Sequence, residues 1–430
     1  MLNASGETVA VLGIPFHNVT MDETIALIEE QIREGGFHQL ATANVDFLKN
    51  ALHNRILRDI LCSCEIVVPD GMPVVWLSRV IGTPLKERVS GIDLVERLAE
   101  VSAKRGYGIF LLGASEERSR LAAKILKQRH PDLRIVGRYS PAPRPIDEMD
   151  HEQILNRIAE ARPDILLVAF GNPKQEEWLA MHRHRLQVPV CIGVGCTLDV
   201  LSGSIPRAPR WMQHCGTEWV YRLLRQPQRL AARYLSDALC LVRHLPFYIS
   251  TTLAQPRRKV EANILVKQVG NTKLISILGD LTGPALDEFN AYSRDACAEG
   301  MNIVLDMSKT GYLGPDSLGS LINLESRMRR RHEKLWLAGL PPHLSRILRA
   351  GQLHNYFMTT TMVSDALYRT AKAEQRLLAS FTPAWGQFQQ DATFIDVRVE
   401  LLQDVCRQIV AVNETEDSTL VPTAFASAGR

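Results

Sequence analysis

Apolar runs alternate with amphipathic segments along the first half of the chain, which predicts β-strands followed by helices. The runs that predict strands cover residues 9–14, 39–44, 65–69, 107–112, 134–136, 164–170 and 190–194. Helical spacing occupies the intervals, at residues 21–28, 45–51, 74–81, 94–104, 115–130, 152–161 and 174–186. Thr20 and Glu23 form a capping-box pattern at the start of the first helix. The alternation is typical of a doubly wound, mainly parallel α/β sheet.

The pattern restarts after a polar break at residues 255–259. Two apolar runs, 264–269 and 273–278, flank the turn pair Gly270-Asn271 and predict a hairpin. Further helices are expected at 285–298, 317–331, 342–350 and 363–373, with strands at 302–306 and 335–337. We therefore place one domain at 1–246, a linker at 247–261, a second domain at 262–372 and a tail at 373–430. The tail is expected to hold one helix at 394–410 and disorder at 413–430.

Composition supports two globular domains without adding a specific function. The chain has 430 residues, 46% hydrophobic content, 23% charged content and a formal net charge of +3. The eight cysteines have no zinc-ligand spacing and mostly lie in apolar runs, which is typical of reduced cysteines in the cytosol. The N-terminus has no basic region before an apolar one, and no 18-residue window lacks charge, so we expect neither secretion nor a membrane-spanning helix.

Polar side chains follow several of the predicted strands. Asp70 comes directly after a buried strand in Pro69-Asp70-Gly71, Thr42 and Asn44 close the strand before it, and Arg88 follows the next helix. Ligands of doubly wound sheets bind at the carboxyl ends of the strands, so these side chains are candidates for one site. Asp70 is either an ordinary turn residue or an acid or base delivered into a cleft.

A second polar cluster lies at residues 171–176, Gly-Asn-Pro-Lys-Gln-Glu. At a helix N-terminus its backbone N–H groups and Gln175 would suit a diphosphate. The chain has no Walker loop and no complete GxGxxG after a strand, which weakens an ATPase or dinucleotide interpretation. Asp93 and Asp199 are rival carboxylates, and we favour a packing role for both.

The first 246 residues contain six short motifs in the same order as in one known protein family. They are Thr42-Ala43-Asn44-Val45-Asp46, Val68-Pro69-Asp70-Gly71, Arg88-Val89-Ser90-Gly91-Ile92-Asp93-Leu94, Leu112-Gly113-Ala114, Gly171-Asn172-Pro173-Lys174-Gln175-Glu176 with Trp178, and Gly193-Val194-Gly195. Over residues 8–246 the chain resembles the WecG/TagA/CpsF glycosyltransferases (glycosyltransferase family 26). The resemblance implies inverting transfer of a hexose or N-acetylhexosamine, of the N-acetylmannosamine type among others, from a UDP-sugar to a polyprenyl diphosphate-linked saccharide. It implies no metal cofactor.

The resemblance also assigns roles to single residues. Asp70 matches the proposed base, which fits the need of an inverting displacement for one group that takes the acceptor proton. Thr42 and Asn44 match positions that line the same pocket. Arg88 and Gln175 match positions expected to contact the nucleotide-sugar or its diphosphate, where a guanidinium stabilises leaving-group charge.

Residues 207–243 contain seven arginines, no lysine and several aromatic residues. Arg222, Arg225 and Arg229 would share a helical face, although Pro227 is expected to divide the segment into two short helices. Arginines among aromatics are compatible with RNA, with an anionic membrane surface, or with a solvated helix that packs on the core. The family resemblance implies an appendage, residues 207–246, that reaches the membrane and closes over the active site. We therefore expect these arginines to contact the membrane surface and the diphosphate, and no nucleic acid.

The second domain resembles the STAS (anti-sigma-factor antagonist) fold over about residues 262–370. The resemblance rests on Val304-Leu305-Asp306-Met307-Ser308 and on residues 311–319. It implies a module that binds a partner protein and is often switched by phosphorylation at the start of a helix. Asp316 aligns with that position and Ser317 follows it, so the ordinary switch is in doubt and we favour a capping role for Asp316.

The sequence therefore predicts an inverting glycosyltransferase of surface-polysaccharide biosynthesis, peripherally bound to the inner face of a bacterial membrane and carrying a STAS module. A homo-oligomer is left open. A Rossmann dehydrogenase and a non-catalytic protein-binding scaffold are the alternatives. The missing GxGxxG disfavours the first, and the presence together of Thr42, Asn44, Asp70, Arg88 and Gln175 disfavours the second.

Overall fold

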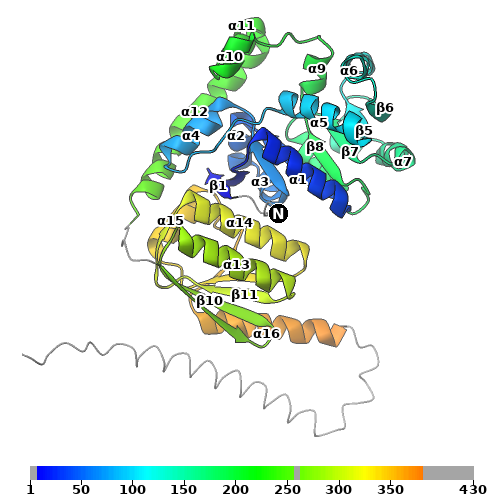
Figure 1. Ribbon diagram of the computed structural model, residues 1–430. Helices are drawn as coiled ribbons and strands as arrows, with labels where there is room; N and C mark the ends of the chain where they lie inside the picture. Colours follow the sequence, from blue (N-terminus) through cyan, green and yellow to red (C-terminus); the bar gives the residue numbers. More distant parts are fainter. Residues whose placement is uncertain (1–6, 256–261, 381–430) are drawn as a thin grey trace, which may run out of the picture.

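The protein consists of two α/β domains, shown by a computed structural model that describes residues 7–255 and 262–380 (Figure 1). Six strands form the sheet of the N-terminal domain: β3 (His38–Ala43), β4 (Ile66–Pro69), β5 (Gly108–Gly113), β6 (Arg134–Tyr139), β7 (Ile165–Ala169) and β8 (Val190–Gly193). Their order is β4-β3-β8-β7-β5-β6, and every neighbouring pair is parallel. The predicted doubly wound parallel sheet is confirmed.

Helices cover both faces of this sheet because alternate strand residues point to opposite sides. The helices of the domain core are α1 (Met21–Glu34), α2 (Val45–His53), α3 (Arg55–Ser63), α4 (Met72–Val80), α5 (Gly91–Arg105), α6 (Glu116–Arg129), α7 (His151–Ala161), α8 (Lys174–Met181) and α9 (Thr197–Leu201), with a short 3-10 helix, η1 (Ile146–Glu148). Ile109 and Leu111 of β5 pack in one apolar cluster with α1, α5 and α6, whereas Phe110 and Leu112 pack in another with α7 and α8.

The first predicted strand, residues 9–14, was wrong in its extent and its place. The segment forms an antiparallel hairpin of β1 (Thr8–Val11) and β2 (Ile14–His17), separate from the parallel sheet. Leu12 and Gly13 make its two-residue turn with positive φ values of 50° and 83°, the backbone form that suits a tight hairpin. The C-terminal domain covers the hairpin, and the apolar residues Val9, Val11, Ile14 and Phe16 are buried in a cluster shared by both domains.

The C-terminal domain has a mixed sheet with helices on it. Its strands are β9 (Asn263–Val269), β10 (Thr272–Leu281), β11 (Asn302–Asp306), β12 (Thr310–Leu313), β13 (Leu335–Ala338) and β14 (Met358–Thr360), in the order β12-β10-β11-β13-β14 with β9 antiparallel to β10. The helices are α13 (Pro284–Ala298), α14 (Pro315–Arg330), α15 (Pro342–Ala350) and α16 (Val363–Ser380). The predicted β9–β10 hairpin is confirmed, and the prediction missed β12 and β14, which are three or four residues long.

The two domains are docked through α14, which packs on the β1–β2 hairpin. Asn323 donates a hydrogen bond to the Thr8 hydroxyl at 3.2 Å, and Arg330 pairs with Glu65 at 3.0 Å. A Cβ added to Gly319 would lie 2.5 Å from the Thr8 carbonyl oxygen. A single apolar cluster contains buried residues of both domains, so the interface is continuous with the core.

The Gly319→Ala variant tests this docking. Alanine favours a helix over glycine by about 1 kcal/mol, so helix propensity alone would stabilise the variant. We expect the opposite, a loss of about 1–3 kcal/mol in the free energy of unfolding, because the added methyl clashes with the backbone of β1. Urea unfolding measures the change, and increased stability would contradict the tight contact.

The arginine-rich appendage forms α10 (Arg210–His214), α11 (Glu218–Arg225) and α12 (Pro227–Leu253). The predicted break before Pro227 is confirmed, but α12 is 27 residues long rather than short. The predicted linker at 247–261 begins too early because α12 runs through Leu253. Gln255 then hydrogen-bonds both the N–H and the C=O of Leu313, each at 2.9 Å, which ties the end of the appendage to the C-terminal domain.

Residues 256–261 of the predicted linker and the predicted tail features at 394–410 and 413–430 lie outside the described residues. The predicted tail boundary at residue 373 falls inside α16. Among the described residues, no helix has the length and apolar character needed to cross a membrane.

Candidate active site

Asp70 lies where β4 turns sharply into α4. Its backbone N–H donates to the Ala43 carbonyl at 2.9 Å, which extends the β3–β4 pairing by one step. Gly71 follows with φ 146°, a conformation that side chains disfavour, and Pro73 occupies the first turn of α4. The turn directs the Asp70 carboxyl into a pocket at the carboxyl ends of the strands. Asp70 is therefore a turn residue and a pocket carboxylate at once.

The pocket around Asp70 is a cavity of about 250 Å³ between the domain core and the appendage. Asn44, Asp70, Arg88 and Ser90 line it from the core. The appendage contributes Glu218, Trp219, Arg222, Arg233, Tyr234 and Asp237. The site thus exists only because residues far apart in the sequence meet across the sheet edge.

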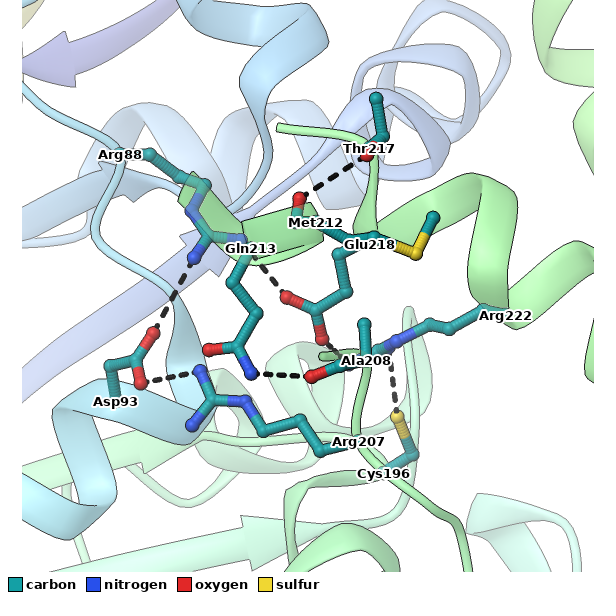
Figure 2. A network of polar contacts seen from close by, with 10 residues as sticks. All are labelled: Arg88, Asp93, Cys196, Arg207, Ala208, Met212, Gln213, Thr217, Glu218 and Arg222. Atoms are coloured by element: carbon teal, nitrogen blue, oxygen red, sulfur yellow. Dashed lines mark hydrogen bonds and ion pairs between the residues drawn. The ribbon is translucent and has the colours of Figure 1, made fainter. Parts of the chain in front are cut away.

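A buried carboxylate, Glu218, holds together Arg88 and Arg222, two of the arginines that line the pocket (Figure 2). Its oxygens accept hydrogen bonds from Arg88 and Arg222, each at 3.1 Å. Asp93 pairs with Arg88 at 3.5 Å and also with Arg207, and the Cys196 sulfur lies 3.8 Å from an Arg222 nitrogen. The network fixes the guanidinium groups of Arg88, from the loop before α5, and Arg222, from the appendage, in one place.

The pKa shifts of Asp70 and Glu218, two of the carboxylates that line the pocket, have opposite directions. Burial raises the pKa of Asp70 to about 6, against the opposing effect of Arg222 and Arg88 and of a hydrogen bond from the Gly91 backbone. Burial also opposes ionisation of Glu218, but the Arg222 and Arg88 charges outweigh it and lower the pKa of Glu218. Glu218 is therefore a permanent anion, whereas Asp70 is ionised near neutral pH yet basic enough to accept a proton.

This pKa predicts the acid side of the activity profile. If Asp70 must be ionised to act, kcat/KM should fall as pH drops through about 6, with a tenfold loss per pH unit well below it. A group at its ordinary pKa of 3.8 would leave activity flat down to about pH 5. Initial rates at fixed ionic strength from pH 5 to 8 measure the midpoint.

Comparison with known proteins identifies the N-terminal domain. Residues 9–255 match the Glycosyl transferase WecG/TagA/CpsF family. The chain belongs to this family of glycosyltransferases. Residues 264–363 match a STAS domain of the MlaB type, so the predicted fusion is confirmed.

The chain aligns with two curated relatives over most of the length of each relative. An N-acetylglucosaminyldiphosphoundecaprenol N-acetyl-beta-D-mannosaminyltransferase of Bacillus subtilis (strain 168) is 31% identical over 254 residues, 59% of this chain and 94% of that protein. The protein of the same name from Staphylococcus aureus (strain MRSA252) is 30% identical over 224 residues, 52% of this chain and 86% of its own. An anti-sigma factor antagonist from Mycobacterium paratuberculosis covers 26% of this chain and 95% of its own, at 17% identity and a TM-score of 0.24.

Asn44 and Arg88 of the glycosyltransferase domain line the Asp70 pocket, as the sequence predicted. The Asn44 side-chain oxygen also caps α2, accepting from the Asp46 and Phe47 N–H groups at 3.0 and 3.4 Å. Thr42 does not line the pocket: it is 5% exposed and its hydroxyl donates to the Gly193 carbonyl at 3.3 Å. Thr42 packs behind Gly91, where a Cβ added to Gly91 would lie 3.2 Å from the Thr42 hydroxyl oxygen, and the Gly91 backbone hydrogen-bonds Asp70.

Gln175 also lies away from the ligand position that the sequence predicted. It is 1% exposed, and its side-chain oxygen accepts from the Gly171 and Gly195 N–H groups at 3.1 and 3.0 Å. Its amide nitrogen donates to Glu176 at 2.7 Å. The Gln175 side chain therefore links the loops that follow β7 and β8. Because its polar atoms already have partners inside the protein, this geometry disfavours a direct contact with diphosphate.

Arg222, Arg225 and Arg229 do not share one helical face, contrary to the prediction. Arg222 points into the pocket, whereas Arg225 and Arg229 are exposed on the appendage and line no part of the pocket. The break between α11 and α12 at Gln226 places Arg229 on a different helix from Arg222 and Arg225. The structure therefore places one of the three arginines in the pocket and the other two on the surface.

Sequence reasoning missed Glu218, Arg233 and Asp237 as pocket residues. A signal for two of them was present, since Glu218 and Asp237 are the acidic residues among the seven arginines of 207–243. Both are buried and paired, Glu218 with Arg88 and Arg222, and Asp237 with Lys49 at 2.6 Å. In this basic segment, both carboxylates therefore contact the domain core.

Asp93 and Asp199, the alternative candidates for the catalytic carboxylate, are both paired with arginines. Asp93 pairs with Arg88 and Arg207, and Asp199 pairs with Arg118 at 3.1 Å.

Proposed function

We propose that the chain is an inverting glycosyltransferase that moves a hexose or N-acetylhexosamine from a UDP-sugar to a polyprenyl diphosphate-linked saccharide. The relatives' names support an N-acetylmannosamine-type sugar and an N-acetylglucosaminyl diphospho-lipid acceptor. The observation that carries the proposal is Asp70, a carboxyl with a pKa of about 6 in a pocket that also holds Arg88 and Arg222.

The chemistry follows from these three side chains. Asp70 takes the proton of the acceptor hydroxyl as its oxygen attacks the anomeric carbon. The bond from that carbon to the UDP oxygen breaks on the opposite side, which inverts the centre. Arg88 and Arg222 stabilise the charge that develops on the leaving diphosphate, so the step requires no metal ion.

A transfer assay tests this function. The full chain is incubated with a panel of UDP-sugars and a polyprenyl diphosphate-linked N-acetylglucosamine acceptor, in parallel with and without chelator, and products are identified by mass spectrometry and NMR. The expected product is one sugar longer, with the anomeric configuration opposite to that of the donor. Failure of every donor, in a protein that still unfolds cooperatively, would favour the non-catalytic scaffold.

Peripheral binding to the inner face of the bacterial membrane is part of the proposal. Leu235, Leu239 and Val242 of α12 are 62%, 61% and 71% exposed and recur at helical spacing on one face. Arg225 ends α11 and Arg229 lies in the first turn of α12, and both side chains are exposed. A helix with an exposed apolar stripe and exposed cations is typical of the interface of an anionic bilayer.

Replacing Leu235, Leu239 and Val242 together by Gln should lower recovery with anionic vesicles at least about tenfold, since each loses roughly 1.5–3 kcal/mol of apolar burial in the bilayer. Vesicle flotation measures the bound fraction. The control is Met362→Gln, an exposed apolar residue (61%) of the C-terminal domain. Equal losses in both proteins would contradict the assignment to α12.

We propose a regulatory or partner-binding role for the STAS module, which docks on the catalytic domain through α14. Ser317 is 0% exposed and its hydroxyl donates to the Leu281 carbonyl, so a kinase has no access to it in the docked state. Gly314 is the N-cap of α14, and the Asp316 carboxylate accepts the Ser317 N–H at 2.8 Å. Asp316 thus satisfies a first-turn donor, although it is not the capping residue itself.

A further inference from the structure

Two helices that pack together outside the Asp70 pocket bring two histidines and a cysteine to one point. His53 lies in the last turn of α2, and Cys240 and His244 are one turn apart on α12. Their ligand atoms all lie within 4.8 Å of one another. Thiolate and imidazole are the ligands that zinc prefers in proteins. None of the three lines the Asp70 pocket.

The surroundings prepare His53 for coordination. Its Nδ1 lies 2.8 Å from the Lys49 carbonyl oxygen, a contact that places the proton on Nδ1 and leaves Nε2 with its lone pair. Metal-bound histidines commonly have such a carbonyl partner on the other ring nitrogen. The rings of His53 and His244 are 5.9 Å apart between centroids and nearly perpendicular, so the two can approach one ion without stacking.

Two cations flank the cluster, one on each helix. Lys49 of α2 pairs with Asp46 at 2.9 Å and with Asp237 at 2.6 Å, so its charge is offset. Arg243 of α12 stands next to His244 and is exposed, so solvent screens its charge. Cys240 is 8% exposed and His53 is exposed, so the sulfur is enclosed while a path from solvent remains on the histidine side.

We infer that His53, Cys240 and His244 form a zinc site that clamps α12 to α2. On binding, Zn²⁺ bonds to one sulfur and two nitrogens, the Cys240 thiol gives its proton to the buffer, and water takes the fourth position. Ligand atoms around tetrahedral zinc are roughly 3.3–3.7 Å apart, so the ion draws these side chains in by about 1 Å. This inference is independent of the proposed sugar transfer.

The clamp acts on the wall of the active-site pocket. Asp237, Ala238 and Leu241 of α12 line the pocket, and the zinc ligands Cys240 and His244 lie in the same turns of the helix. The Lys49–Asp237 ion pair holds α12 to α2 one turn earlier. Zinc therefore adds a second tie between the same helices, and its expected effect is on the stability of the appendage rather than on the reacting atoms.

Metal analysis of the full chain, purified without a polyhistidine tag, tests the site. The chelator-treated protein is dialysed against Zn²⁺ and then against buffer, and zinc is counted by mass spectrometry. We expect one equivalent per chain in the wild type and in the control variants Cys215→Ser and His184→Ala, whose side chains are exposed. Cys240→Ser and His244→Ala should bind at least about 100-fold more weakly.

Cobalt gives a readout of the ligands themselves. Co²⁺ in place of zinc should show a near-ultraviolet band from thiolate-to-metal charge transfer, which disappears in Cys240→Ser and persists in Cys215→Ser. Zinc should also raise the melting temperature of the wild type and leave that of Cys240→Ser unchanged. Wild-type protein that binds no more zinc than Cys240→Ser, or cobalt spectra without a thiolate band, would overturn the inference.

Discussion

Replacing Asp70 by Asn is expected to lower kcat for sugar transfer by about 10²–10⁴-fold, the usual contribution of a general base. The amide keeps the shape of the carboxyl but cannot accept the acceptor proton. Binding of the UDP-sugar should survive, because Arg88 and Arg222 remain in place. Single-turnover rates and calorimetric titration with the donor separate the two effects.

The same variant should be more stable than the wild type above pH 6. The pKa of Asp70 is about 6 in the folded protein against an ordinary 3.8, so the fold disfavours the ionised form. Ionisation therefore costs the wild type up to about 3 kcal/mol at pH 8, a cost that fades as pH falls toward 3.8. Gain of stability with loss of turnover is typical of a catalytic residue.

Asp199→Asn is the matched control, because Asp199 pairs with Arg118 and lines no part of the Asp70 pocket. It should keep turnover within a few-fold of wild type. Near-normal turnover of Asp70→Asn would remove Asp70 from its role as base. Equal loss in both variants would point to damage to the fold instead.

Replacing Arg222 by Ala is expected to lower kcat by about 10²-fold, the loss typical of one group that stabilises transition-state charge. It also removes a cation that lowers the pKa of Asp70, so the acid limb of the pH profile should move to higher pH. A residue that only anchors the helix would not shift that midpoint. Initial rates with a short-chain, water-soluble acceptor measure both effects without a membrane.

The control for Arg222 is the double variant Arg225→Ala/Arg229→Ala. Both of these side chains are exposed and outside the pocket, so turnover of the soluble acceptor should be unchanged while recovery with anionic vesicles falls. If this variant lost turnover of the soluble acceptor as Arg222→Ala does, the division of the three arginines would be wrong.

Local signals in the sequence predicted most elements correctly. Thr20 and Glu23 form the complete capping box at the start of α1 that their spacing indicated. The Gly270-Asn271 turn produced the β9–β10 hairpin, and Pro227 divided the appendage. These features depend on residues within a few positions of one another, which is why pattern and spacing were sufficient.

Predictions failed where the deciding contact comes from another part of the chain. The run 9–14 has the apolar pattern of a strand buried in the main sheet, yet it turns back at Leu12-Gly13 and is buried under α14, some 300 residues later. Gln175 stands in a polar loop that looked suited to a ligand, but Gly195 and Glu176 use its amide. The hydrophobic pattern indicates that a residue is buried, but it does not indicate which part of the chain packs against that residue.

The sequence by itself determined the parallel sheet, the two-domain organisation and the carboxylate at the end of β4, because strand period, turn residues and ordered motifs are local properties. Only the tertiary structure decided that Arg222 and Glu218 reach Asp70, that Arg225 and Arg229 do not, and that His53 meets Cys240 and His244. Those positions depend on how α11 and α12 pack on the core. Burial then raised the pKa of Asp70 to about 6, a property of the assembled pocket that no stretch of sequence carries.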